Sequence, residues 1–329
     1  MSWSFLMNRY PKNIGEKQMK TAFLFSGQGA QYQGMGQDLY HETTVKETFE
    51  EASDLLGYDM AELCFSENER LNQTIYTQPA ILTVSIAFYR LLKERGIMPQ
   101  AALGLSLGEY SALVASEALT FGEAVVLVAK RGAYMTEAAP VGSGKMVAIM
   151  NAPVEVIEES CLEAQAYGIV SPANYNTPQQ IVIGGEEKAV DEAVRILQEK
   201  GIKRMIPLNV SGPFHTAILA PAAKKLAVEL KTIAFNEPKI PVISNTTTEI
   251  MKKDQIPTLL EQQVMKPVHF YESIQQLKEL GIEHVIEVGP GKVLSGFMKK
   301  IDKTIPVLRV ENQQTFEETI SSIGGMLWS

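Results

Sequence analysis

Apolar and polar positions along this chain fall into two alternating patterns, short apolar runs and longer amphipathic stretches. Apolar runs at residues 21–25 and 101–105 each have the length of one buried strand, and each continues into a turn that contains glycine. Apolar residues then recur at helical spacing over residues 75–94 and 109–134. A strand, a glycine-containing turn and a helix in that order predict the βα units of a mostly parallel sheet, with one long helix over residues 109–134.

The pattern changes after residues 140–144, a break with the sequence Pro-Val-Gly-Ser-Gly. From residue 145 to residue 210, strands and helices are predicted in the order β-α-β-β-α-β, which is the signature of a ferredoxin-like subdomain. We expect its second and third strands to be joined by a turn at residues 174–178, Asn-Tyr-Asn-Thr-Pro. Beyond this subdomain the first pattern returns, with a strand expected at residues 241–244.

These changes predict an α/β fold in three parts. Residues 19–142 and 212–329 are expected to form one α/β domain, and residues 143–211 a ferredoxin-like subdomain inserted into it. Residues 1–18 are interpreted as an N-terminal extension of unknown role, because Met19 is a more natural start.

Composition and charge narrow the class of protein. The 329 residues are 45% hydrophobic and 21% charged, which is ordinary for a globular protein, and the net charge of −8 argues against nucleic acid as a partner. Cys64 and Cys161 are far apart and lack metal-ligand spacing, a pattern typical of a reduced, cytoplasmic protein. No apolar run approaches the roughly 18–20 residues of a membrane span. No metal site and no membrane association are therefore expected.

The strongest chemical signal is the pentapeptide Gly-Leu-Ser-Leu-Gly at residues 104–108. Between a strand and a helix, Gly-x-Ser-x-Gly is typical of a nucleophile elbow, a sharp turn that lifts the serine hydroxyl above the sheet edge. Ser106 would then lie at a helix N-terminus, where backbone N–H groups favour a developing oxyanion. An ordinary βα loop that contains a serine is the alternative. The pentapeptide alone leaves both open.

A serine nucleophile needs a base, and the chain has four histidines. His215 is the preferred candidate, because it lies in a kinked loop after a predicted strand, where bases are often placed. His41 is expected to be exposed, His284 to be half-buried at the start of a strand, and His269 lacks a neighbouring glycine.

Two further features concern charge. Between Ser106 and His215 no acidic residue lies in a distinctive loop, so a Ser-His dyad oriented by another group is favoured. Arg131 follows an apolar helical stretch. Its guanidinium either extends into water from the helix end or binds a substrate carboxylate with two parallel hydrogen bonds.

Five motifs occur in order along the chain: Phe-Ser-Gly-Gln-Gly-Ala-Gln at 25–31, Gly-Leu-Ser-Leu-Gly-Glu-Tyr at 104–110, Lys-Arg-Gly at 130–132, Gly-Pro-Phe-His at 212–215 and Glu-Val-Gly-Pro-Gly at 287–291. Together they resemble malonyl-CoA:acyl-carrier-protein transacylases and the acyltransferase domains of polyketide synthases. The resemblance extends from about residue 19 to beyond residue 310. It implies a hydrolase-like α/β core with an inserted ferredoxin-like subdomain.

The resemblance implies a ping-pong reaction in fatty-acid or polyketide synthesis. Ser106 would attack the thioester of malonyl-CoA with His215 as the base, and the malonyl group would then pass to the phosphopantetheine thiol of an acyl carrier protein. The backbone N–H groups of Gln28 and Leu107 would form the oxyanion hole. Such a transfer needs no metal and no cofactor. The family also implies a monomer.

The remaining roles are likewise implied by the resemblance. Arg131 would pair with the malonyl carboxylate, and the backbone carbonyl of Gln263 would orient the catalytic histidine. Phe214 and Met135 are the expected specificity residues. The family usually has histidine before the nucleophile, whereas this chain has Leu105, so we expect altered packing at the elbow but an intact reaction.

Two other functions are considered. An acyl hydrolase that removes stalled acyl groups from carrier proteins would use the same serine, but it has no use for the cation of Arg131. A non-catalytic docking module would be expected to have lost Ser106 or His215, and both are present. Because carrier proteins are acidic, we also predict a local basic patch near the mouth of the active site.

Overall fold

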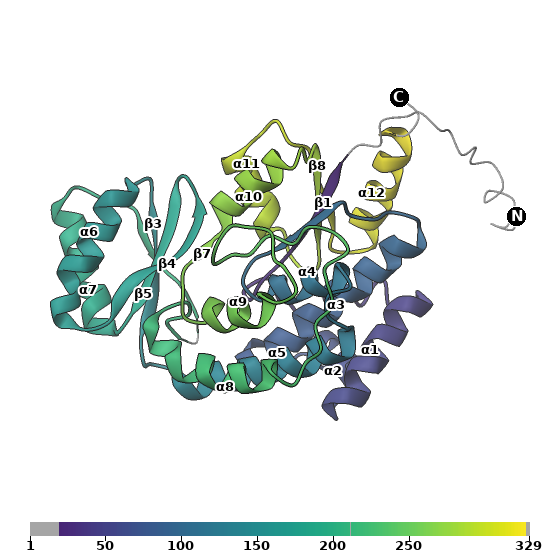
Figure 1. The fold of residues 1–329 in the computed structure, drawn as a ribbon, viewed down its shortest axis with the longest axis horizontal. Helices are drawn as coiled ribbons and strands as arrows, with labels where there is room; N and C mark the ends of the chain where they lie inside the picture. Colours follow the sequence, from purple (N-terminus) through teal and green to yellow (C-terminus); the bar gives the residue numbers. More distant parts are fainter. Residues whose placement is uncertain (1–19, 211, 327–329) are drawn as a thin grey trace, which may run out of the picture.

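The computed structural model describes residues 20–210 and 212–326, which form two sheets with helices around them (Figure 1). The predicted N-terminal extension, residues 1–18, lies outside the described residues. The first sheet has four parallel strands in the order β2-β1-β8-β9. Its strands are β1 (Thr21–Phe25), β2 (Ala101–Gly104), β8 (His284–Val288) and β9 (Val307–Val310).

Helices cover both faces of this sheet, and strand β1 shows why. Side chains alternate along a strand, so Phe23 and Phe25 pack into the core on the side of α3 and α5, while Ala22 and Leu24 pack against α10 and α11. The helices of this part are α1 (Thr43–Leu56), α2 (Met60–Phe65), α3 (Thr74–Glu94), α4 (Gly108–Ala115), α5 (Phe121–Ala138), α8 (Ala220–Leu230), α9 (Ile256–Gln263), α10 (Phe270–Glu279), α11 (Val293–Ile301) and α12 (Gln313–Met326).

The second sheet is mixed, has five strands in the order β6-β3-β5-β4-β7 and lies at one end of the molecule's long axis (Figure 1). Helices α6 and α7 pack on one of its faces around a separate apolar cluster. The α/β class, the parallel core sheet and the separate subdomain sheet are thus confirmed, whereas the domain boundaries stay a prediction. Its elements are β3 (Lys145–Met150), α6 (Val154–Ala164), β4 (Val170–Thr177), β5 (Gln180–Gly185), α7 (Glu187–Glu199), β6 (Met205–Pro207) and β7 (Val268–His269).

Strand β7 joins this sheet from a distant part of the chain. Four of the strands come from the predicted subdomain and pair in an antiparallel manner, but β7 pairs in parallel with β4, Asn174 opposite Val268. The expected turn at residues 174–178 is wrong, because β4 continues to Thr177 with partners on both of its edges. The pairing with β5 has two register shifts, between Pro172 and Asn174 and between Tyr175 and Thr177.

The single long helix expected over residues 109–134 is also wrong, since the chain forms α4 and α5 with a break between them. Glu117 has a φ of 61°, in the left-handed region, which ends the first helix. Thr120 then starts the second helix with a capping box, in which its side chain accepts from the backbone N–H of Glu123 and the Glu123 carboxylate accepts from the backbone N–H of Thr120.

The strand expected at residues 241–244 is reduced to single bridges. Val242 bridges Ala102 in parallel, and Ile243 bridges Ile250. This segment nevertheless runs beside β2 and delivers Asn245 to the end of the first sheet, where the candidate site lies.

Candidate active site

Ser106 lies in a tight turn between β2 and α4, and its backbone is strained. Its φ is 53°, a conformation that residues other than glycine rarely adopt. A Cβ added at Gly104 would lie 1.8 Å from the backbone carbon of Gly108, and one added at Gly108 would lie 2.1 Å from the carbonyl oxygen of Phe25. Both glycines are therefore required by close backbone approach, as the elbow interpretation demands.

The elbow is held from outside by Asn245, a residue that the sequence analysis missed. Its Oδ1 accepts from the backbone N–H of Ser106 at 2.7 Å, and its Nδ2 donates to the carbonyl of Gly104 at 2.8 Å. A polar residue at the end of the apolar run 241–244 was a usable signal, because such ends often line sites in parallel sheets.

His215 lies beside Ser106. The Oγ of Ser106 is 2.8 Å from Nε2 of His215, and Nδ1 of His215 is 2.8 Å from the backbone carbonyl oxygen of Gln263. Because that carbonyl only accepts, Nδ1 carries the proton and Nε2 is free to accept one from the serine. Burial, with a contribution from the charge of Arg131, lowers the pKa of His215 to about 4, so the ring is neutral at pH 7.

The other histidines lie elsewhere. His41 is exposed and His284 is partly buried at the start of β8. His269 stacks on Tyr175 with ring centroids 4.7 Å apart. Of the four histidines, only His215 lies beside the nucleophile.

Arg131 is buried in the middle of α5, with 1% of its surface exposed, so the interpretation in which its head group extends into water is wrong. Its Nη2 donates to Oγ of Ser106 at 3.2 Å and to Oε1 of Gln263 at 2.9 Å. Its Nε has no partner among the described residues. A buried guanidinium with a free donor beside a nucleophile is suited to bind an anionic group of a substrate.

The two predicted oxyanion donors have free backbone N–H groups. Within residues 20–210 and 212–326, neither the N–H of Gln28 nor that of Leu107 has a hydrogen-bond acceptor. The side chain of Gln28 is fixed on α3, since its Nε2 donates to Thr74 and its Oε1 accepts from Gln78. These two contacts fix the position of Gln28, whose backbone N–H can then donate to a developing oxyanion.

These groups open into a cavity of about 240 Å³ between the two sheets. Phe214, 8% exposed, and Met135, 2% exposed, line its wall, as does Leu105. The subdomain contributes polar side chains from β4, among them Asn176, whose buried Oδ1 has no partner in the described part of the chain. The cavity therefore combines an apolar wall with a few polar groups, as small-molecule sites generally do.

Comparison with known proteins decides the family. Residues 22–313 match the family described as "Acyl transferase domain". The chain belongs to this acyl transferase family. It is 44% identical over 308 residues to the malonyl CoA-acyl carrier protein transacylase of Bacillus subtilis, covering 92% of this chain and 97% of the relative. It is 45% identical over 288 residues to that of Escherichia coli, covering 86% and 93%.

Solved structures of acyl transferases have the same fold. The crystal structure of MCAT from Streptococcus pneumoniae is similar with a TM-score of 0.91 and 59% identity, covering 92% of this chain and 100% of that one. A malonyl-transacylase solved in complex with its type II PKS acyl-carrier protein is similar with a TM-score of 0.89 and 40% identity, covering 92% and 99%.

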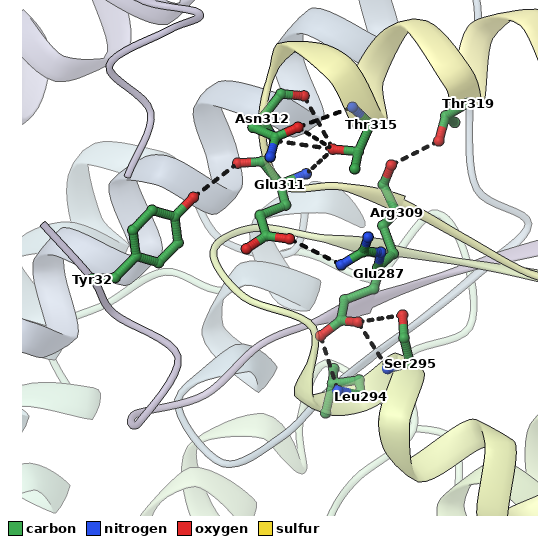
Figure 2. A network of polar contacts seen from close by, with 9 residues as sticks. All are labelled: Tyr32, Glu287, Leu294, Ser295, Arg309, Glu311, Asn312, Thr315 and Thr319. Carbon is green, nitrogen blue, oxygen red and sulfur yellow. Dashed lines mark hydrogen bonds and ion pairs between the residues drawn. The ribbon is translucent and has the colours of Figure 1, made fainter. Parts of the chain in front are cut away.

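A second polar network fixes one wall of the acyl transferase cavity (Figure 2). Glu287, buried at the end of β8, accepts from the backbone N–H groups of Leu294 at 2.9 Å and Ser295 at 2.8 Å, and from the Ser295 hydroxyl at 2.5 Å. Arg309 on β9 pairs with Glu311 at 3.0 Å, and its positive charge also acts on the carboxylate of Glu287. Burial raises the pKa of Glu287.

That network positions α11. The carboxylate of Glu287 satisfies N–H groups in the first turn of this helix, which otherwise lack partners. Val293 and Phe297 of α11 line the cavity. Glu287 lies in the predicted Glu-Val-Gly-Pro-Gly motif, so the motif supports the wall of the site while remaining outside the cavity lining.

No group of three or more metal-ligating side chains is found in the described ranges, and no helix there is long and apolar enough to cross a membrane.

Proposed function

We propose that this acyl transferase moves a malonyl group from malonyl-CoA to the phosphopantetheine thiol of an acyl carrier protein, in fatty-acid or polyketide biosynthesis. The observation that carries the proposal is the buried guanidinium of Arg131, which donates to the nucleophile hydroxyl of Ser106 at 3.2 Å. A cation at that distance favours an acyl group that ends in a carboxylate. The relatives described above are named for this reaction.

In the first half-reaction Oγ of Ser106 attacks the thioester carbonyl carbon of malonyl-CoA. Nε2 of His215 takes the hydroxyl proton, and the negative charge moves onto the carbonyl oxygen, facing the N–H groups of Gln28 and Leu107. The carbon–sulfur bond then breaks, the proton on His215 passes to the leaving thiolate, and CoA departs. The product is a malonyl ester of Ser106.

In the second half-reaction the phosphopantetheine thiol of the carrier protein gives its proton to His215. The thiolate attacks the ester carbon, the same two N–H groups bind the oxyanion, and Ser106 leaves with the proton from His215. Atoms and charges balance without a cofactor. The carbonyl of Gln263 keeps the imidazole oriented through both halves and stabilises its transient positive charge.

The carrier protein would dock at the cavity mouth. Helix α11 supplies Val293 and Phe297 to the cavity, and its exposed basic residues Lys292, Lys299 and Lys300 suit an acidic partner. Charge reversal of these lysines should slow transfer to the carrier protein more than acylation by malonyl-CoA. Equal slowing of both halves would contradict this docking face. We further propose that the enzyme is cytoplasmic and acts as a monomer. Analytical ultracentrifugation would test the oligomeric state.

The decisive experiment is intact-protein mass spectrometry after brief incubation with malonyl-CoA or acetyl-CoA. Wild type should gain a malonyl adduct that is absent in Ser106→Ala and is weakened, or replaced by an acetyl adduct, in Arg131→Ala. Adding holo carrier protein should remove the adduct and acylate the carrier. Rapid loss of the adduct to water without a carrier would instead identify an acyl hydrolase, and absence of any adduct would contradict acyl transfer.

A further inference from the structure

Glu109 is a buried carboxylate next to the nucleophile turn that has no part in the steps above. It follows Gly108 in the first turn of α4 and is 1% exposed. One of its oxygens accepts from the backbone N–H of Asn245 at 2.6 Å, and the other accepts from Nε2 of Gln263. Burial raises its pKa to about 7. Burying a carboxylate is costly, so its contacts indicate what it does there.

The amide of Gln263 is fully committed in one orientation. Its nitrogen donates to the carboxylate of Glu109 and to the backbone carbonyl of Ser106 at 2.8 Å, and its oxygen accepts from Nη2 of Arg131 at 2.9 Å. If the amide were flipped, its oxygen would face two acceptors and its nitrogen would face a guanidinium donor. The carboxylate of Glu109, together with the Ser106 carbonyl, therefore favours the orientation that places an acceptor in front of Arg131.

In the described part of the chain, Nη2 of Arg131 donates only to that amide oxygen and to the Ser106 hydroxyl, and its Nε has no partner. The guanidinium also lies over the Tyr110 ring, 5.5 Å from its centroid, and Gln263 supplies the hydrogen bond that orients it beside the nucleophile. Burial lowers the pKa of Arg131, and the neighbouring Tyr110 and Glu109 oppose that shift.

We propose that Glu109 is a positioning residue that acts through the amide of Gln263 to hold Arg131 in the orientation that binds an acyl carboxylate. This rests on the proposed function, since it explains how the same site prefers malonyl over uncharged acyl groups. Glu109 is not a catalytic residue, because it touches neither Ser106 Oγ nor His215.

The test is the ratio of serine acylation by malonyl-CoA to acylation by acetyl-CoA, followed by rapid quench and mass spectrometry. In Glu109→Gln the new amide must keep an oxygen on the N–H of Asn245, so its nitrogen faces the nitrogen of Gln263, donor against donor. We expect the ratio to fall at least tenfold, mainly through a higher KM for malonyl-CoA, with acetyl transfer within about threefold of wild type.

Two further variants separate positioning from general damage. In the Arg131→Ala background, adding Glu109→Gln should change the ratio by less than twofold, because the group on which it acts is gone. Glu287→Gln is the matched control, a second buried glutamate outside the cavity lining, whose oxygens accept from Leu294 and Ser295 and not from Gln263. It should leave the ratio within twofold of wild type.

If Glu109→Gln fails to fold, Gln263→Met provides the same test, since it removes the amide and keeps the backbone carbonyl at His215. It should lower the ratio by a similar factor. Equal losses with malonyl-CoA and acetyl-CoA, or an undiminished effect of Glu109→Gln without Arg131, would overturn the assignment. A wild-type enzyme that forms no malonyl adduct would instead contradict the proposed function itself.

Discussion

Glu109 and Glu287 are both buried glutamates that accept backbone N–H groups beside a turn at the end of a parallel strand, yet they serve different parts of the site. Glu109 is linked by one amide to Arg131, which touches the nucleophile. Glu287 is linked to the first turn of α11, whose Val293 and Phe297 line the cavity wall (Figure 2). The comparison teaches that a buried carboxylate is functional through the groups it orients. Its burial alone does not distinguish the two roles.

The largest difference in acylation rate is expected between a variant that lacks a reacting group and a variant of the residue that supports the cavity wall. His215→Ala removes the base, so serine acylation should fall by about 10³-fold or more. Glu287→Gln should reduce the same rate by at most about fivefold, because it only loosens α11. Single-turnover acylation with malonyl-CoA measures both. A loss of similar size in the two variants would erase the distinction.

The pH dependence sharpens the catalytic side of the comparison. Burial and the charge of Arg131 lower the pKa of His215 to about 4. Only the neutral imidazole accepts a proton, so acylation should persist at pH 5 and fall near pH 4. Removing the cation in Arg131→Ala should raise the pKa of His215 and move this fall to higher pH.

Acetyl-CoA is the suitable donor for that profile, because it carries no carboxylate that needs Arg131. At pH 5 the variant should lose a larger share of its neutral-pH rate than wild type does. Identical acid limbs in the two proteins would show that Arg131 leaves the base unaffected.

A smaller effect is expected on the stability of the wall. In Glu287→Gln one of the two oxygens becomes an NH2 donor, which then faces the N–H group of either Leu294 or Ser295. Leaving a buried donor unpaired costs about 1–3 kcal/mol, so the free energy of unfolding should fall by that amount. Denaturation in urea provides the measurement, and an unchanged midpoint would contradict the capping role.

The smallest effect concerns the helix that carries Arg131. Thr120→Ala removes the hydroxyl that caps α5, which should lower the free energy of unfolding by about 1 kcal/mol. The ratio of malonyl to acetyl transfer should stay as in wild type, since Thr120 precedes Arg131 by about three turns of helix. A changed ratio would show that Thr120, like Glu109 and unlike Glu287, affects the orientation of Arg131.

Features of the fold could be predicted from the sequence where they depend on residues that are neighbours in the chain. Strand β1 occupies the predicted residues 21–25, because a short apolar run ended by Ser26 and a glycine defines a buried strand without outside help. The break between α4 and α5 was missed because both helices share one apolar periodicity. The Thr120 and Glu123 pair that separates them was nevertheless readable as a capping box.

The site residues that escaped prediction are those whose partners are distant in the chain. Glu109 looked like a carboxylate on a helix face, and its partners Asn245 and Gln263 lie 136 and 154 residues further along. No sequence spacing encodes such a meeting, since it exists only after the two sheets have formed. The serine and the base were found because each lies in a turn with its own local signature.

Strand β7 has a consequence for anyone who wishes to recombine acyl transferases. Exchanging the subdomain as one continuous segment would pair β4 of one parent with β7 of the other, because its parallel partner at Val268–His269 lies well downstream in the chain. If the two strands fit poorly, the edge of β4 is left open to pairing with other chains and to aggregation. A functional chimera should therefore carry two pieces from the same parent, the segment from β3 to β6 and the short stretch that contains β7.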